Sequence, residues 1–360
     1  MRAERRPASP LLRRRGRGGV SRLCRTLAAL AIVAAALAAT PTCAAPAPAF
    51  DVVVLGSAGG LAEDDLTSFL VFPAGGDAGV ALDAGTLHAG IRAALAKGAF
   101  ASLRLDDASD NLTPEGRVLQ RHVKAYLVTH AHLDHVAGLI LNSTDDTPKP
   151  ILALPATLDV LREHVFNWKL WPNFTTEGAA PALSRYTLLP LASGEAKDVP
   201  GTSFRVTASP LSHGGASEST AFLVEGGGQI LLYLGDTGPD AVEGKGRLRA
   251  LWTQVAPLVR EKKLRAIFLE ASYSSDRPDA KLYGHLTPRW INEELGVLAS
   301  LVNPDDPASA LRGLPVVITH VKPSLERGET PRERIARELR ETNPYGVRFL
   351  LATQGEKLAL

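Results

Sequence analysis

From residue 50 onward, short apolar runs alternate with longer stretches in which apolar positions recur at helical spacing. The short runs have the length and composition of buried strands, and Gly, Pro and Asp clusters separate them. They predict strands at residues 51–55, 68–72, 79–83, 125–129, 151–153, 204–208, 220–224, 229–234, 266–270, 316–319 and 347–352. The longer stretches predict helices near residues 87–96, 137–141, 156–164, 248–261, 288–300 and 331–340.

Strands and helices alternate along this whole region, and no segment repeats at the spacing of a solenoid or a propeller. Such a pattern predicts a layered α/β protein with helices outside the sheets. No boundary divides the region. We therefore expect residues 46–360 to form a single domain, preceded by a leader at residues 1–45.

The leader has the order of segments that directs export. Its nine arginines and single glutamate are followed by the apolar run Leu27–Ala39 and then by small residues and proline. This order is typical of a secretory signal peptide, and the apolar run is short for a membrane span. We expect a periplasmic or secreted protein with no stable membrane insertion once the signal peptide is cleaved. An uncleaved N-terminal membrane anchor is the alternative.

Removal of the leader changes both the charge and the cysteine content. Nine arginines against one glutamate give the leader +8, and subtracting this from the chain's +2 leaves about −6 for residues 46–360. Such a region lacks the clustered positive charge that nucleic-acid binding requires, so no nucleic-acid partner is expected. Both cysteines, Cys24 and Cys43, lie in the leader. A metal site in the remaining chain must therefore use His and carboxylate ligands.

One short segment concentrates the candidate chemistry. His130, His132, Asp134 and His135 follow an apolar run and precede a helical pattern. A protein core would not tolerate three imidazoles and a carboxylate without partners. Neutral imidazole and carboxylate are ligands that zinc prefers, and at a strand-to-helix turn the four side chains can point to one place. A pH sensor or a chance surface patch is the other interpretation of this cluster.

The pattern His-x-His-x-Asp-His is that of the metallo-β-lactamase superfamily. The longer string His130–Ser143 resembles the signature of the class II cyclic-nucleotide phosphodiesterases. Residues 51–60 (DVVVLGSAGG) are similar to the first strand and glycine turn of that family, and Asp83-Ala84-Gly85 resembles the superfamily's Asp-x-Gly turn. The resemblance extends from about residue 50 to the C-terminus. It implies a four-layer αββα metallo-β-lactamase sandwich with metals at one edge.

Carried over residue by residue, the resemblance also implies two metal sites. Three further ligands would each follow a predicted strand, namely His213, Asp236 and His320. One divalent ion, zinc in this prediction, would be held by His130, His132, His213 and Asp236. The second would be held by Asp134, His135, His320 and the shared Asp236. Taken singly, an Asp after a strand is more often a turn residue or a helix cap, so the inference depends on the complete set.

A later segment supplies a second kind of candidate. Tyr283-Gly-His-Leu-Thr-Pro288 resembles the same family, and the resemblance implies that His285 and Thr287 bind substrate. It places His285 near the scissile phosphate rather than the metals. Thr287 is also expected to cap the helix that Pro288 begins. An ordinary surface histidine is the alternative for His285.

Other histidines and an aromatic segment have simpler interpretations. His88, His122 and His164 have no partner ligands nearby in the sequence and are expected to be ordinary histidines. The aromatic residues of 168–174 are expected to pack in the core. A stacking wall for a purine base is the alternative for that aromatic segment.

These features predict hydrolysis of cyclic AMP or cyclic GMP to the 5′-monophosphate at a two-metal site. Asp134 would orient the attacking hydroxide and His285 would protonate the leaving 3′-oxygen. A small cyclic nucleotide is the predicted partner, and a homodimer is left open. Three alternatives remain at this point: a hydrolase of the same fold acting on lactones, β-lactams or thioesters, an RNA 3′-processing phosphodiesterase, and a binding protein with a vestigial site.

Overall fold

The computed structural model describes residues 47–360, apart from residues 107–109 and 216. Residues 48–360 form one compact unit. The predicted leader and both cysteines lie outside the described residues, so the export signal stays a prediction. Among the described residues, no helix has the length and hydropathy needed to cross a membrane.

Two seven-stranded sheets form the centre of the described region. In sheet order, the first contains β14 (Lys357–Ala359), β1 (Phe50–Gly56), β2 (Ser68–Pro73), β3 (Gly79–Leu82), β4 (Val123–Leu127), β5 (Lys149–Ala153) and β6 (Tyr186–Pro190). The second contains β13 (Arg348–Leu351), β12 (Pro315–Thr319), β11 (Leu264–Glu270), β10 (Gln229–Leu234), β9 (Glu218–Gly226), β8 (Arg205–Ser212) and β7 (Ala196–Asp198).

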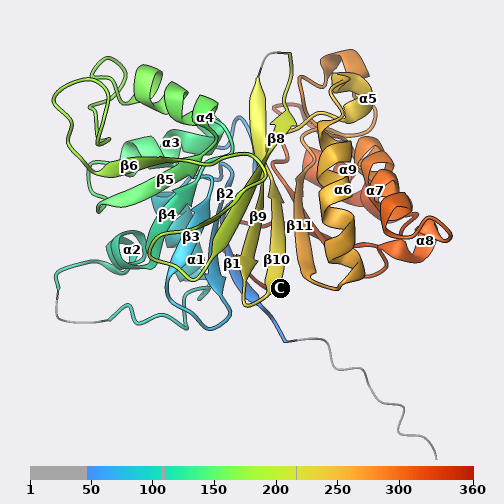
Figure 1. Cartoon of the computed structure of the whole chain (residues 1–360), viewed down its shortest axis with the longest axis horizontal. Coiled ribbons are helices and arrows are strands. Elements are labelled where there is room, and N and C mark those ends of the chain that lie inside the picture. Colours follow the sequence, from blue (N-terminus) through green and yellow to red (C-terminus); the bar gives the residue numbers. More distant parts are fainter. Residues whose placement is uncertain (1–46, 107–109, 216) are drawn as a thin grey trace, which may run out of the picture. The chain divides into compact units, whose positions relative to one another are not determined.

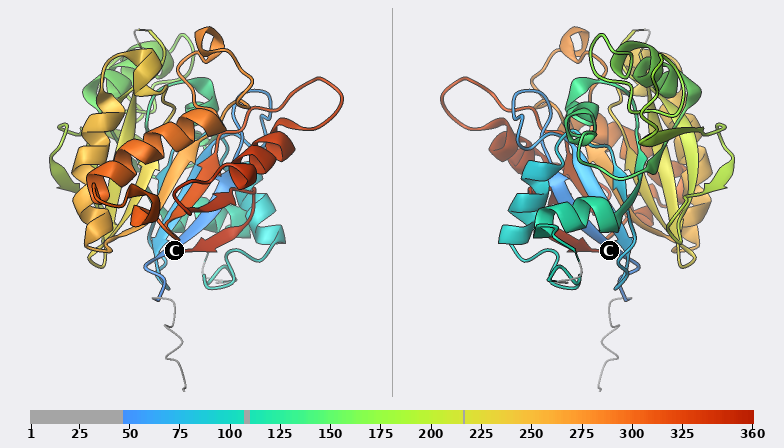
Figure 2. Two further views of the ribbon diagram at one scale, coloured as in Figure 1. Left: turned by 90° about the vertical axis from the view of Figure 1, so that its right-hand side faces the viewer. Right: turned by 90° about the vertical axis from the view of Figure 1, so that its left-hand side faces the viewer.

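Helices lie on the outer face of each sheet (Figures 1 and 2). The first half of the chain supplies α1 (His88–Ala96), α2 (Pro114–Arg117), α3 (Leu133–Asn142) and α4 (Pro155–Val160), with π-helical turns at Val118–His122 and Leu161–Val165. The second half supplies α5 (Asp240–Glu243), α6 (Arg247–Arg260), α7 (Pro288–Val302), α8 (Pro307–Ala310) and α9 (Pro331–Glu341), with a 3₁₀ turn at Asp279–Lys281.

Three separate apolar cores follow from this layering. β1 illustrates the cause, because its successive side chains point to opposite faces of the sheet. Val52 and Val54 pack between the two sheets, whereas Val53 and Leu55 pack beneath α1 and α3. A third core lies between the second sheet and α6, α7 and α9. Strands covered on both faces need continuous apolar runs, which explains why the sequence predicted them so clearly. The observed order of layers is αββα.

Parallel pairing decides where the functional loops meet. β3, β4 and β5 run parallel to one another, as do β10, β11 and β12. The carboxyl ends of parallel strands share one edge of a sheet, and the loops that follow them form the usual site of chemistry in α/β proteins. The loops after β4, β10 and β12 carry His130, Asp236 and His320, so three distant parts of the chain arrive at one place.

All eleven predicted strands and all six predicted helices are present; β10 has the predicted bounds, and the other elements are shifted at one or both ends. The missed elements are short: β6, β7 and β14, the short helices α2, α5 and α8, and the turns at Val118–His122 and Asp279–Lys281. β7 and β14 each have three residues, which is too few to show a period. The helix predicted at 156–164 is divided into α4 and a π-helical turn.

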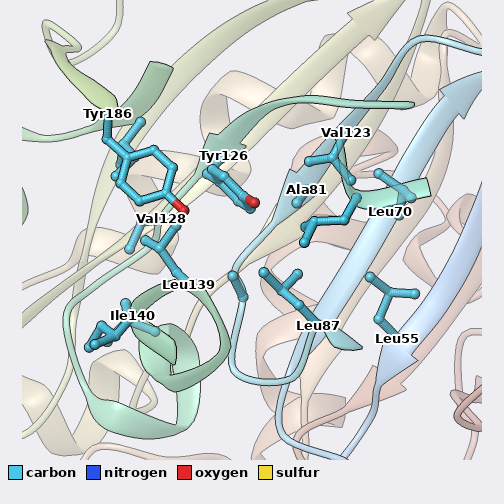
Figure 3. Packing of buried hydrophobic residues seen from close by; sticks show 14 of the residues in the cluster. Leu55, Leu70, Ala81, Leu87, Val123, Tyr126, Val128, Leu139, Ile140 and Tyr186 are labelled. Atoms are coloured by element: carbon cyan, nitrogen blue, oxygen red, sulfur yellow. The ribbon is translucent and has the colours of Figure 1, made fainter. Parts of the chain in front are cut away.

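A buried polar cluster supports the outer core of the first sheet, where Figure 3 shows Tyr126 and Tyr186 beside one another. The carboxylate of Asp146, which is 1% exposed, accepts hydrogen bonds from the Tyr126 hydroxyl at 2.6 Å and the Tyr186 hydroxyl at 3.0 Å. It also pairs with Lys149 Nζ at 2.6 Å. Burial lowers the pKa of Lys149, and Asp146 opposes this shift. The Asp146 carboxylate therefore supplies the negative charge that stabilises the buried Lys149 ammonium.

Asp146→Ala is expected to lower the free energy of unfolding by about 3–5 kcal/mol, because it leaves the Lys149 ammonium buried without a counter-ion. Urea denaturation followed by circular dichroism measures the change. The neighbouring Asp145 is exposed, so Asp145→Ala is a matched control that should change the unfolding free energy by less than about 0.5 kcal/mol. Equal effects of the two substitutions would contradict the role given to Asp146.

Candidate metal centre

The segment between β4 and α3 supplies the first group of side chains. β4 ends at Leu127, and α3 begins at Leu133 with His132 at its N-cap position. The rings of His130 and His132 lie 4.5 Å apart between centroids, and those of His130 and His135 lie 4.2 Å apart. The strand-to-helix turn therefore gathers the three imidazoles, as the spacing predicted.

Asp236, directly after β10, lies at the centre of the site. Its carboxylate is 3.9 Å from His130 Nε2 and 3.3 Å from His135 Nε2. The same carboxylate is 3.8 Å from His213 Nε2 and 3.2 Å from His320 Nε2. Asp236 is 2% exposed, so four imidazoles surround a carboxylate that is removed from solvent.

Asp134 and His132 complete the two sides of this arrangement. On one side, Asp134 Oδ2 lies 3.2 Å from His320 Nε2 and accepts a hydrogen bond from the Gly60 backbone N–H at 3.1 Å. On the other, His132 Nδ1 lies 3.2 Å from His213 Nε2. All seven predicted ligands are therefore brought into one cluster.

The glycine turn after β1 allows His320 to reach the cluster. A Cβ atom on Gly59 would lie 2.3 Å from Cε1 of the His320 ring. Only a residue without a side chain leaves room for the imidazole at this position. His320 itself has a positive φ of 55°, which is uncommon for a residue with a Cβ.

Hydrogen bonds on the outer side of the imidazoles fix which nitrogen faces inward. His135 Nδ1 lies 2.8 Å from Asp83 Oδ2, and His130 Nδ1 lies 3.0 Å from Thr129 Oγ1. His213 Nδ1 lies 2.9 Å from the carbonyl oxygen of Gly284. A ring that donates through Nδ1 presents an unprotonated Nε2, which is the atom that binds a metal.

The pKa shifts of three imidazoles and of Asp236 also favour ligation, whereas that of His135 opposes it. Burial lowers the pKa of His130, His132 and His213, so these imidazoles are neutral at neutral pH. Burial opposes ionisation of Asp236, but the surrounding imidazoles, His320 and His135 first, hold its pKa well below its usual range. Burial likewise opposes a charge on His135, yet the carboxylates of Asp236 and Asp83 raise its pKa. A metal ion that binds here must displace that proton.

Two buried atoms show that the cluster fits a metal. His130 Nε2 and His135 Nε2 are inaccessible to solvent and have no hydrogen-bond partner. Leaving a buried polar atom unpaired costs free energy, so such atoms require a reason. Both point toward Asp236 within a set of His and carboxylate groups that could hold a metal ion. Coordination of a divalent cation satisfies them.

Comparison with known proteins decides the family. A profile of the cAMP phosphodiesterases class-II matches residues 52–355. The chain belongs to the class II cAMP phosphodiesterase family. A relative from Aliivibrio fischeri, a 3′,5′-cyclic-nucleotide phosphodiesterase, is 40% identical over 309 residues, which are 86% of this chain and 92% of that protein. A probable 3′,5′-cyclic-nucleotide phosphodiesterase of Yersinia pestis is 39% identical over 308 residues, or 86% and 88% of the two chains.

Solved structures agree with this assignment. Unliganded yeast PDE1 matches with a TM-score of 0.77 and 26% identity over 87% of this chain and 100% of that chain. A metallo-β-lactamase fold protein of Bacillus subtilis, YhfI, matches with a TM-score of 0.55 and 15% identity over 87% and 99% of the two chains. The predicted αββα metallo-β-lactamase sandwich is therefore confirmed for this member of the class II family.

His285 lies closer to the candidate metal ligands of this class II chain than the sequence predicted. Its Nδ1 is 3.7 Å from Asp236 Oδ2, and its ring lies 4.9 Å from that of His213 between centroids. The prediction had set it apart from the metal ligands. Because it is 4% exposed and could join Asp236 and His213 around an ion, His285 belongs to the same cluster.

Two carboxylates that sequence reasoning did not assign to the site organise it from behind. Asp83, quoted only as part of a turn, accepts hydrogen bonds from Thr129, His135 and Tyr233. Glu270, the last residue of β11, lies 2.9 Å from His285 Nδ1 and accepts a hydrogen bond from Ser272 Oγ at 2.6 Å. Burial would lower the pKa of His285, but Glu270 raises it. For both Asp83 and Glu270, the signal in the sequence that could have identified them was a carboxylate at the end of an apolar strand.

The remaining predicted residues have defined positions in this class II protein. Thr287 is fully buried, and its hydroxyl accepts a hydrogen bond from Trp290 N, which confirms the predicted helix cap. Its contact with substrate stays a prediction. His88 and His164 are exposed, and His122 lies 2.8 Å from the carbonyl oxygen of Asp77.

The aromatic segment divides between core and surface. Phe174 belongs to the core beneath the first sheet, and Trp171 packs against it. These two residues fit the core-packing prediction. Trp168 remains 45% exposed, with its indole N–H donating to the carbonyl oxygen of Pro181.

Proposed function

We propose that this class II chain hydrolyses cyclic AMP and cyclic GMP to their 5′-monophosphates with the help of two divalent ions. The observation that carries the proposal is the central position of Asp236 among imidazoles, two of which, His130 and His135, have an inward Nε2 with no hydrogen-bond partner. The names of the relatives from Aliivibrio fischeri and Yersinia pestis supply the substrate class.

Seven side chains would hold the ions. His130, His132, His213 and Asp236 would hold one, and Asp134, His135, His320 and Asp236 would hold the other. Their nitrogen and oxygen donors suit zinc. Two divalent ions, when bound, lower the pKa of a nucleophilic water and neutralise charge that develops on the phosphodiester.

The residues around the ions have separate tasks. Asp134, which the Gly60 N–H holds in place, would orient the attacking oxygen. With Nδ1 of His285 paired to Glu270 Oε1, Nε2 is the ring nitrogen left to donate a proton to the leaving 3′-oxygen. Thr287 would keep this segment in place by capping α7.

The experiment is a substrate panel with the zinc-loaded protein. We expect turnover of both cyclic nucleotides, loss of turnover with a chelator and recovery when zinc is added back. Lactone, β-lactam and thioester substrates should react far more slowly. Absence of cyclic-nucleotide turnover above that of a metal-depleted sample would refute the proposal.

We further propose that residues 1–45 direct export to the periplasm or the medium and are then removed. Support comes from the arginine-rich start and the apolar run Leu27–Ala39. N-terminal sequencing of the protein recovered from periplasmic and membrane fractions tests this. An intact N-terminus in the membrane fraction would favour an anchor instead.

A further inference from the structure

A polar cavity of about 710 Å³ opens beside the candidate metal centre. Ser272, Tyr273 and Arg277 line it from the segment after β11, and Lys322 lines it from the segment after β12. Ser272 Oγ is 3.1 Å from His285 Nδ1 and 3.0 Å from His320 Nδ1. Ser272 therefore connects the lining of the cavity to two imidazoles of the centre.

Three side chains form an outward path from the centre, which we call the stacking platform: Tyr273, Arg277 and Tyr283. The ring of Tyr273 meets that of His285 edge to face, with centroids 5.7 Å apart. The Arg277 guanidinium carbon lies 4.4 Å from the centroid of Tyr273 and 5.7 Å from that of Tyr283. These distances are within the range of cation–π contact, so the guanidinium is held between two rings.

Tyr283 is held at the surface by its backbone. Its side chain is 64% exposed, and its φ of 52° lies in the left-handed region, which is uncommon for an aromatic residue. The next residue, Gly284, offers its carbonyl oxygen to His213 Nδ1 at 2.9 Å. A large exposed ring in a strained conformation, tied to a candidate metal ligand, is the kind of outlier that points to binding.

A second cavity beside Asp134 offers a comparison. It measures about 1050 Å³ and is lined by four carboxylate residues, no Lys or Arg, and no aromatic ring except the imidazole of His88. The 710 Å³ cavity is lined by four basic and three acidic residues together with Tyr273. An anionic substrate is therefore attracted more strongly to the 710 Å³ cavity, which is the less acidic of the two.

Lys322 brings positive charge close to the metal centre on that side. Its Cδ lies 4.0 Å from the position that a Cβ on Gly60 would take, and its backbone N–H donates to the carbonyl oxygen of Ser272. The N–H of the same Gly60 donates to Asp134, so the lysine stem lies close to the glycine that holds this candidate ligand. The cavity is thus lined by the cation of Lys322 and by Tyr273 and Arg277 of the platform, and Tyr283 lies beside it, against Arg277.

We infer that the 710 Å³ cavity is the nucleoside subsite, with the purine base lying against the stacking platform. This inference rests on the proposed function and adds the place where the nucleoside binds. Bases stack on aromatic rings and on guanidinium planes, and stacking is tolerant of base identity because every base has a π-face. The platform therefore contributes similarly to binding of adenine and guanine nucleotides.

The kinetic test uses Tyr283→Ala. Its KM for cyclic AMP and for cyclic GMP should each rise by about fivefold to tenfold, because one stacking surface is lost. Ribose 3′,5′-cyclic phosphate, which lacks the base, is the reference substrate. The rise for the two nucleotides should exceed the rise for this reference by at least about fivefold. An equal rise for all three substrates, or no rise, would overturn the inference.

Two matched variants sharpen the result. Tyr283→Phe keeps the ring and should restore the KM of the parent protein to within about twofold. Leu141 is 62% exposed and lines the 1050 Å³ cavity, so Leu141→Ala should leave both KM values unchanged. A rise in the KM of Leu141→Ala, with none in Tyr283→Ala, would place the base in the other cavity and overturn the inference.

A binding measurement separates this inference from the proposed function. Calorimetry with adenosine 5′-monophosphate and ribose 5-phosphate should show a preference for the nucleotide that Tyr283→Ala reduces by about fivefold. If the parent protein hydrolyses no cyclic nucleotide, the proposed function fails. The preference for adenosine 5′-monophosphate over ribose 5-phosphate still tests whether the base binds to the stacking platform. A preference that Tyr283→Ala leaves intact would overturn the platform even in an active enzyme.

Discussion

Asp236→Asn is expected to reduce kcat/KM for cyclic AMP by roughly a thousandfold or more, because it changes the group shared by both proposed ion sites. The carboxylate lies within 3.9 Å of an inward nitrogen of His130, His135, His213 and His320. The amide of Asn is neutral, and an NH₂ group replaces one of the two carboxylate oxygens. This NH₂ group donates hydrogen bonds and cannot coordinate a cation. Metal analysis by inductively coupled plasma mass spectrometry should show fewer ions per chain than in the parent protein.

The control is an Asp→Asn change far from the cluster. The side chain of Asp198 in β7 is 87% exposed, so Asp198→Asn should retain both metal and activity. Circular dichroism should show that Asp236→Asn remains folded. Retention of metal content and of activity within about tenfold of the parent would contradict a shared carboxylate ligand.

Asp83→Asn is expected to weaken metal binding by about tenfold to a hundredfold although Asp83 touches no proposed ion. Its carboxylate accepts hydrogen bonds from Thr129 N, His135 Nδ1 and the Tyr233 hydroxyl, each at 2.8 Å. The amide group of Asn has one acceptor oxygen, so His135 loses its outer partner or shares it. Asn tolerates the φ of 51° found here, which limits backbone strain. Competition with a chromophoric chelator measures the affinity.

Tyr233→Phe is the matched control for Asp83→Asn. It removes one donor to the same carboxylate and keeps the ring, which is buried between the sheets. His135 would then retain its acceptor, so metal affinity should stay within about threefold of the parent. An equal loss of affinity in both variants would mean that packing, rather than orientation of His135, determines the effect.

The layers of this class II fold could be predicted because their signal is local. Residues 52–55 form a continuous apolar run because β1 is buried on both faces, by the second sheet on one side and by helices on the other. The strands that were missed lie at sheet edges. β14 has three residues and is defined by its pairing with β1, which lies about three hundred residues away in the chain.

The candidate ligands also divide into those with a local signal in the sequence and those without one. His130, His132, Asp134 and His135 share one strand-to-helix turn, so their chemistry is visible in a six-residue window. His213, Asp236 and His320 could be assigned only through the family resemblance, because nothing local distinguishes an Asp after a strand from an ordinary turn residue. Parallel pairing of β10, β11 and β12 is what brings Asp236 and His320 to the same edge.

By itself, the sequence determined the strands, the helices and the local histidine cluster, because apolar periodicity and short spacing are properties of neighbouring residues. Only the tertiary structure decided that Asp83 supports His135, that Glu270 pairs with His285, and that the ring of Tyr283 lies beside Arg277. These contacts join residues from separate strands and loops. Their partners are set by how the two sheets pack, and no short segment of the chain records that packing.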